Sequence, residues 1–174
     1  WAYKMASEIR VSPINVSSGT VFATDASGVY AHLEADSGRL LWRGRTFNTI
    51  SSQAAVDNVS IFVPSEDRTL YALDRTTGRD RWDFPTDRPL TQSPMSYRLS
   101  LFLPVPGREL VALNSVNGAE KWRYKKAVKP VGVVNDQLLV MTPRELELMD
   151  MDTGRAIVSL ATNRPISHAL LGEK

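Results

Sequence analysis

The fold of this chain is decided by one stretch, Ala72-Leu73-Asp74-Arg75-Thr76-Thr77-Gly78-Arg79-Asp80-Arg81-Trp82, because variants of it recur along the sequence. Two variants end at Trp42 and Trp122, and a more divergent one runs from residue 148 to residue 158. The four tryptophans stand at positions 1, 42, 82 and 122, so the repeat period is 41, 40 and 40 residues. A period of about 40 residues is typical of architectures in which each repeat buries its apolar face against its neighbours.

Each repeat has the pattern of short strands, not of helix. In the second repeat, β-favouring runs at 60–64, 69–74 and 80–84 are separated by polar turns at 65–68 and 75–78, and a weaker run lies at 52–56. Short runs with polar turns at this spacing predict an antiparallel meander. Four strands per 40-residue repeat indicate an all-β fold, a β-propeller of four-stranded antiparallel blades.

The residues shared by the repeats have structural roles in this interpretation. The glycines are expected at the tight turn between the third and fourth strands, where a positive φ favours glycine; they are Gly38, Gly78, Gly118 and Gly154. Asp74 and Asp150 can accept amide hydrogens in that turn. The tryptophans begin the outer strands, and we expect Trp42, Trp82 and Trp122 to be buried in the wedge between neighbouring blades.

The motif Ala-x-Asp-x-x-Thr-Gly-x-x-x-Trp, complete at 72–82, resembles the tryptophan-docking repeat of the quinoprotein-like (pyrroloquinoline quinone repeat) β-propellers. The resemblance covers nearly the whole chain. That family includes quinone-dependent alcohol dehydrogenases, the lipoprotein type of the outer-membrane barrel-assembly machinery, and repeat domains fused to bacterial kinases. The resemblance implies a ring of seven or eight blades. It says little about activity, because one fold supports many functions.

The strand pattern predicts about four blades within a single partial propeller spanning 1–174. Trp1 begins a segment similar to those that begin at Trp42 and Trp122, so 1–5 is expected to be an outer strand. The blades are expected at about 9–46, 49–86, 91–126 and 129–161, followed by the inner strand of a further blade at 165–171. Val158 stands where the fourth blade would carry its tryptophan. We expect the open ends to be completed by further polypeptide of the same chain or of another.

The composition and the resemblance together argue against catalysis. The quinone dehydrogenases have an adjacent-cysteine disulfide, a calcium or lanthanide held by Glu, Asn and Asp, and an Asp base. This chain has no cysteine, and the other motifs match none of its residues. His32 and His168 lack metal-ligand spacing and are interpreted as surface or blade-packing side chains. We therefore expect no catalytic residue, no cofactor and no metal site.

The most basic segment, residues 121–129, is the candidate interaction site. The candidate contact residues within it are the cations Arg123, Lys125, Lys126 and Lys129. Strand alternation would turn Trp122 and Tyr124 inward and Arg123 and Lys125 to solvent, and such charges protect an outer strand from edge-to-edge pairing. A contact with an acidic protein or lipid, or with nucleic acid, is the alternative use of this pattern. The formal charge of +2 is too small to imply a nucleic-acid partner.

These observations favour a non-catalytic, protein-binding scaffold or accessory subunit of a larger bacterial assembly. The expected partners are other protein chains, not nucleic acid. No apolar run is long enough to span a membrane. The resemblance implies an extracytoplasmic location, in the periplasm or at the outer membrane. A sensory or ligand-binding propeller of a longer receptor or kinase, and a fragment of a quinone-dependent dehydrogenase, are the alternatives.

Overall fold

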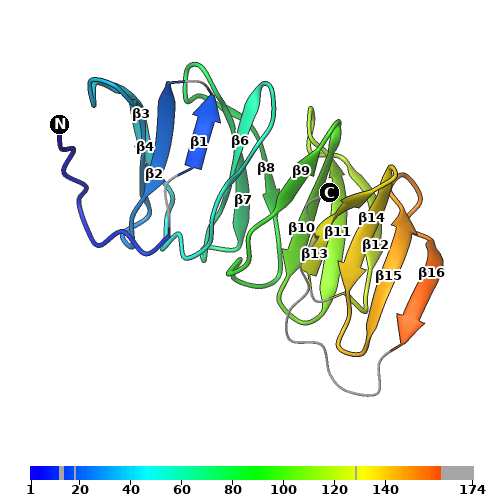
Figure 1. Cartoon of the computed structure of the whole chain (residues 1–174). Coiled ribbons are helices and arrows are strands. Elements are labelled where there is room, and N and C mark those ends of the chain that lie inside the picture. The colour runs from blue at the N-terminus through cyan, green and yellow to red at the C-terminus, as the bar shows by residue number, and fades with distance from the viewer. Residues whose placement is uncertain (12–13, 18, 128, 162–174) are drawn as a thin grey trace. The chain divides into compact units, whose positions relative to one another are not determined.

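The computed structural model describes residues 1–11, 14–17, 19–127 and 129–161, which form sixteen strands and their turns (Figure 1). Within this described part there is no helix, and hence none that could cross a membrane. The strands form four antiparallel sheets of four strands, each sheet ordered as the chain runs. The all-β fold of four-stranded, blade-like sheets predicted from the sequence is therefore confirmed.

The chain divides into two compact units, the first comprising Trp1–Ser93 and the second beginning at Pro94. The first unit contains two sheets. One sheet consists of β1 (Ile14–Ser17), β2 (Thr20–Thr24), β3 (Val29–Glu34) and β4 (Leu40–Arg45). The other consists of β5 (Ala55–Val56), β6 (Ser60–Pro64), β7 (Thr69–Asp74) and β8 (Asp80–Pro85).

The second unit repeats this arrangement. One sheet consists of β9 (Met95–Tyr97), β10 (Ser100–Val105), β11 (Glu109–Asn114) and β12 (Glu120–Tyr124). The other consists of β13 (Lys129–Val134), β14 (Gln137–Met141), β15 (Glu145–Asp150) and β16 (Ala156–Ala161).

The apolar core of each unit lies between its two sheets. In the first unit, side chains from both sheets form one buried cluster: Phe22, Tyr30, Ile50, Ile61, Val63 and Leu73. In the second unit the equivalent cluster is Phe102, Leu110, Ala112, Ala127, Leu138, Val140 and Met149. Strands β6 and β10 are buried at every residue, whereas the outer strands β4 and β8 alternate between exposed and half-buried residues. A single sheet has no such core, so neighbouring sheets depend on each other for burial.

A β-bulge recurs at the same place in all four sheets. The pairing of the third and fourth strands skips one outer-strand residue, namely Leu41, Arg81, Lys121 and Ile157. The next residue is the motif tryptophan, or Val158 in the last sheet. A bulge adds twist and redirects the side chain that follows it. The bulge therefore sets the direction of the tryptophan.

The first residues of the chain differ from the sequence expectation, whereas the last described sheet lies where the sequence placed it. Residues 1–5, expected to be an outer strand, form no strand, because no described strand lies beside them to complete a hydrogen-bond ladder. Strand β16 is exposed at all of its residues, and Val158 is 55% exposed. The inner strand expected at 165–171 lies outside the described residues.

Candidate functional site

The motif tryptophans dock on the glycine turn of the following repeat. In the first unit, the indole Nε1 of Trp1 donates a hydrogen bond to the carbonyl of Ala35 at 2.7 Å, and that of Trp42 donates to the carbonyl of Arg75 at 3.2 Å. In the second unit, Nε1 of Trp122 donates to the carbonyl of Met151 at 2.8 Å. Each acceptor lies three residues before the motif glycine. The contact thus links one repeat to the next within a unit.

Two physical constraints select glycine at these turns. The φ values are 70° at Gly38, 71° at Gly78, 74° at Gly118 and 66° at Gly154, all in the left-handed region. A Cβ added to Gly78 would lie 2.5 Å from Cδ2 of Trp42, and one added to Gly154 would lie 2.5 Å from Cδ2 of Trp122. A Cβ at Gly38 would overlap the ring of Trp1. The sequence pattern indicated the backbone conformation but not this close approach of the ring.

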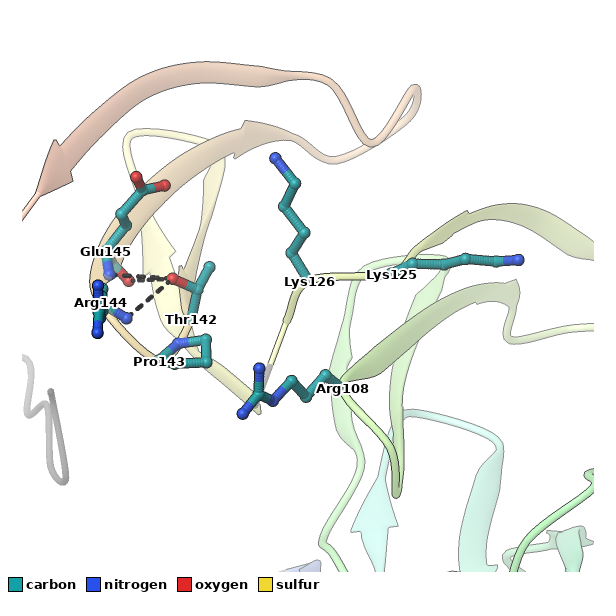
Figure 2. Close-up of a pocket in the computed structure, with 7 residues that line it drawn as sticks. All are labelled: Arg108, Lys125, Lys126, Thr142, Pro143, Arg144 and Glu145. Atoms are coloured by element: carbon teal, nitrogen blue, oxygen red, sulfur yellow. Dashed lines mark hydrogen bonds between the residues drawn. The ribbon is translucent and has the colours of Figure 1, made fainter.

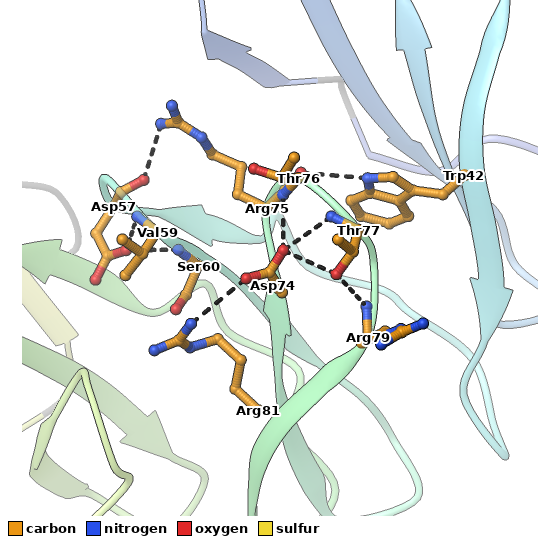
Figure 3. A network of polar contacts seen from close by, with 10 residues as sticks. All are labelled: Trp42, Asp57, Val59, Ser60, Asp74, Arg75, Thr76, Thr77, Arg79 and Arg81. Atoms are coloured by element: carbon orange, nitrogen blue, oxygen red, sulfur yellow. Dashed lines mark hydrogen bonds and ion pairs between the residues drawn. The ribbon is translucent and has the colours of Figure 1, made fainter.

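Asp74 organises the turn on which Trp42 docks (Figure 3). Its Oδ1 accepts hydrogen bonds from the amides of Thr76 and Thr77 at 3.1 and 2.8 Å and from the Thr77 hydroxyl at 2.9 Å. These hydrogen bonds hold the pKa of Asp74 below its usual value. Asp150 makes the same set of contacts with Asp152 and Thr153. The two aspartates therefore stabilise their turns through Oδ1.

The burial of the tryptophans is less complete than we expected. Trp42, Trp82 and Trp122 are half-buried, and Trp1 is 64% exposed. Each ring of the three internal tryptophans packs on a phenylalanine of its own sheet, with centroid distances of 5.7, 5.6 and 5.9 Å for Phe22, Phe62 and Phe102. The rings lie on outer strands, so one edge stays in contact with solvent.

His32 packs against a docking tryptophan in the first unit. It is 5% exposed, and its ring centroid lies 4.9 Å from that of Trp42. Neither ring nitrogen has a hydrogen-bond partner among the described residues. Burial, and secondarily the charge of Arg75, lower the pKa of His32 below its usual value. His32 is therefore a neutral blade-packing side chain; His168 lies outside the described residues.

The structure gives different surroundings to the four candidate cations of the basic segment. Arg123 is already paired, with Nη1 2.9 Å from Oε2 of Glu109 and Nη2 2.7 Å from Oε2 of Glu120. The hydrogen bond with Glu120 contributes most to raising the pKa of Arg123. Lys129 is half-buried in β13. Among the described residues of this segment, Lys125 and Lys126, just after β12, are the cations that are exposed and form no ion pair.

Lys125 and Lys126 border a hollow in the second unit, here called the basic pocket. The basic pocket has a volume of about 620 Å³ and is lined by Arg108, Lys125, Lys126, Thr142, Pro143, Arg144 and Glu145. In Figure 2, the Arg108 guanidinium reaches toward Pro143, and Lys126 extends from the same side of the hollow. Lys125 extends away from the 142–145 turn. Arg108 and Lys126 are thus the two cations that face this turn.

The turn opposite these cations is fixed by its own hydrogen bonds. Oγ1 of Thr142 accepts from the amides of Arg144 and Glu145 at 3.4 and 2.9 Å and donates to the Glu145 carbonyl at 3.2 Å. The hydroxyl is therefore occupied within the turn. The other polar side chains that line the basic pocket are charged: Arg108, Lys125, Lys126, Arg144 and Glu145.

Arg108 and Arg144 lie outside the basic segment that the sequence pattern indicates. Both lie in the turn between the second and third strands of successive sheets, β10–β11 and β14–β15. These turns are far in sequence from residues 121–129, but the meander brings both turns to the end of the sheet where β12 also ends. Comparing equivalent turn positions across the repeats could have suggested them.

The first unit carries an exposed aromatic side chain on a fixed loop. Phe47 follows β4 and is 92% exposed. Its amide donates to Oδ2 of Asp67 at 2.9 Å, and Oγ1 of the preceding Thr46 bonds to the carbonyl of Asn48 at 2.5 Å. The second repeat has Asp87 at the equivalent position. Phe47 is therefore an exposed aromatic that the repeat itself does not require.

Among the described residues, no cluster of three or more His, Asp or Glu side chains could hold a metal ion.

Solved structures share this fold across much of the chain. BamB from Moraxella catarrhalis is 17% identical, with a TM-score of 0.74, and the match covers 86% of this chain and 51% of that one. Quinohemoprotein alcohol dehydrogenase from Comamonas testosteroni is 14% identical, with a TM-score of 0.76 and coverage of 91% and 35%. The β-propeller domain of Cps50 (Swd1) from Myceliophteria thermophila is 12% identical, with a TM-score of 0.74 and coverage of 94% and 58%. At these identities the likeness establishes the fold alone.

The chain thus spans about half the length of the Moraxella protein. No curated protein matches it in sequence. The family described as outer membrane protein assembly factor BamB matches residues 1–131, which is well over half of the sequence. The chain therefore belongs to this family of propellers built from pyrroloquinoline quinone-type repeats.

Proposed function

We propose that this chain is part of a non-catalytic propeller that binds other proteins as an accessory subunit of a bacterial outer-membrane assembly, on the periplasmic side. Membership of the outer membrane protein assembly factor family is the observation that carries the proposal. These 174 residues contain no cysteine, so this part of the propeller does not carry the cysteine pair that the quinone dehydrogenases of the wider family use.

The surface features support a binding role. The basic pocket in the second unit combines exposed cations with apolar lysine stems and Pro143. Phe47 in the first unit presents an aromatic ring on a loop whose backbone amide donates a hydrogen bond to the Asp67 carboxylate. Arginine and aromatic residues are enriched where protein interfaces concentrate their binding energy. Rigid strands that carry variable loops are a common arrangement for such surfaces.

The test is deletion of the gene in its source bacterium. We expect lower amounts of β-barrel proteins in isolated outer membranes, measured by quantitative mass spectrometry, and recovery when the intact gene is returned on a plasmid. Lipoproteins and inner-membrane proteins serve as the internal control. Unchanged β-barrel levels in the deletion strain would contradict the proposed role.

A further inference from the structure

We propose that the basic pocket binds a carboxylate-rich segment of a partner protein, with Arg108 and Lys126 as the contacting cations; this rests on the proposed protein-binding function. The pocket is concave, about 620 Å³ in volume, and lies beside the fixed 142–145 turn. Hollows of roughly 300–1,000 Å³ are of the size that encloses a small ligand or a few side chains.

The charge of the basic pocket favours an anion. Four of its lining residues are cations and one, Glu145, is a carboxylate. Within the described part of the chain, Arg108, Lys125 and Lys126 form no ion pair with another residue. Arg123, on the neighbouring strand, shows the contrast, because Glu109 and Glu120 already neutralise it. Arg108, Lys125 and Lys126 therefore bring unpaired positive charge to one place, where complementary charge gives specificity.

The side-chain geometry suits carboxylates. The Arg108 guanidinium presents several N–H donors in one plane, which matches the two oxygens of a carboxylate. Lys126 adds a second charge on the same side of the hollow (Figure 2). Glu145 lies on the opposite side, so its charge directs an incoming anion toward Arg108 and Lys126. Pro143 and the lysine stems supply apolar surface for the methylene groups of Glu or the backbone of a peptide.

An acidic peptide fits this surface better than a membrane or a nucleic acid. Those polyanions require positive charge spread over a broad face. Here Arg123, the cation that precedes Lys125 on β12, is already paired with Glu109 and Glu120, and the whole chain carries a formal charge of only +2. The positive charge is therefore confined to a concave site of peptide dimensions.

The binding test uses purified full-length protein and a fluorescein-labelled hexaglutamate peptide as the probe. Fluorescence anisotropy at low salt gives the affinity, and hexaglutamine is the uncharged control peptide. We expect Lys126→Glu and Arg108→Glu each to weaken hexaglutamate binding by about tenfold or more, as for loss of a charged hydrogen bond. Arg79→Glu is the matched control, because Arg79 is exposed on a turn of the first unit and its replacement changes the net charge equally.

Several outcomes would overturn the proposal. Equal weakening by Arg79→Glu would show that overall charge, not the basic pocket, attracts the peptide. Equal binding of hexaglutamine would exclude carboxylate recognition. A separate experiment uses vesicles of phosphatidylglycerol. If the wild-type protein binds these vesicles but not hexaglutamate, and Lys126→Glu abolishes vesicle binding, the basic pocket is a lipid site. Circular dichroism spectra identical to wild type establish that each variant is folded.

A complementation assay separates this inference from the proposed function. If Lys126→Glu and Arg108→Glu lose peptide binding and also fail to restore β-barrel levels in the deletion strain, both proposals hold. If they lose peptide binding but restore those levels fully, the pocket is not the partner site, although the proposed function stands. If the deletion has no effect on barrel proteins while the peptide still binds in the pocket, the proposed function fails and the pocket remains an acidic-peptide site.

Discussion

Replacing Gly78 by alanine should be among the most damaging single-methyl additions in the first unit. Gly78 has a φ of 71°, and its new Cβ would lie 2.5 Å from Cδ2 and 2.9 Å from Cγ of Trp42. Both atoms belong to the base of the indole, which cannot rotate away without moving the whole ring. The ring must therefore leave its position over the turn or the turn must shift.

The expected loss of unfolding free energy has two parts, one from the backbone conformation and one from the contact with Trp42. A left-handed conformation costs an L-residue roughly 1–2 kcal/mol relative to glycine. Overpacking against a fixed neighbour adds about 1–3 kcal/mol. We therefore expect Gly78→Ala to lower the free energy of unfolding by roughly 2–5 kcal/mol, the sum of both parts.

Gly19→Ala is the matched control for the conformational part. Gly19 has a φ of 82°, and an added Cβ would meet nothing within 4 Å. This variant should lower stability by only about 1–2 kcal/mol. Urea denaturation followed by far-UV circular dichroism measures both variants without relying on tryptophan fluorescence.

A double-mutant cycle tests whether the indole is the obstacle. In a Trp42→Ala background, Gly78→Ala should cost no more than Gly19→Ala, because the clashing ring is gone. Equal destabilisation by Gly78→Ala and Gly19→Ala in the presence of Trp42 would refute the docking argument. So would a cycle in which the effects of Gly78→Ala and Trp42→Ala simply add.

Three further predictions concern other sites. Because the pKa of His32 is lowered in the folded state, the imidazole of the unfolded chain binds a proton more readily. The free energy of unfolding should therefore decline as the pH falls below about 6.5. In thermal melts from neutral to acidic pH, His32→Ala should make this decline shallower. Tyr124→Phe removes the 2.6 Å hydrogen bond to Glu147, which is 3% exposed, and should lower the unfolding free energy in urea by about 1–3 kcal/mol. Tyr71→Phe should cost less in the same assay, because its half-buried acceptor keeps other donors. Phe47→Ala should leave the thermal midpoint unchanged but reduce complementation of the deletion strain.

The repeat itself could be predicted because its signals are local. The turn at Gly78, the aspartate at 74 and the strand before each turn are encoded within a few residues, and the 40-residue spacing repeats them. Residues 1–5 resembled an outer strand equally well, yet a strand exists only where a neighbour supplies hydrogen bonds. The similarity of residues 1–5 to the outer strands therefore could not show whether a neighbouring strand is present to pair with them.

The basic pocket could not be predicted because it depends on contacts between distant segments. Alternation correctly placed Arg123 among the exposed residues, but its partner Glu109 lies on the adjacent strand β11. Only the pairing of β11 with β12 shows that this cation is already neutralised. Arg108 enters the pocket from a turn outside the basic segment. A run of cations in the sequence therefore did not show which cations lie together, without ion pairs, on the surface.

The topology of each sheet separates the residues that hold the repeats together from those assigned to binding. In a four-stranded meander, the turns after the first and third strands lie at one end of the sheet, and the turn after the second strand and the exit from the fourth lie at the other. The docking glycines occupy the first end. Arg108, Lys126 and Phe47 occupy the second end of their sheets. Substitutions at the second end therefore leave the tryptophan–glycine contacts intact, so a binding surface can change there without loss of the fold.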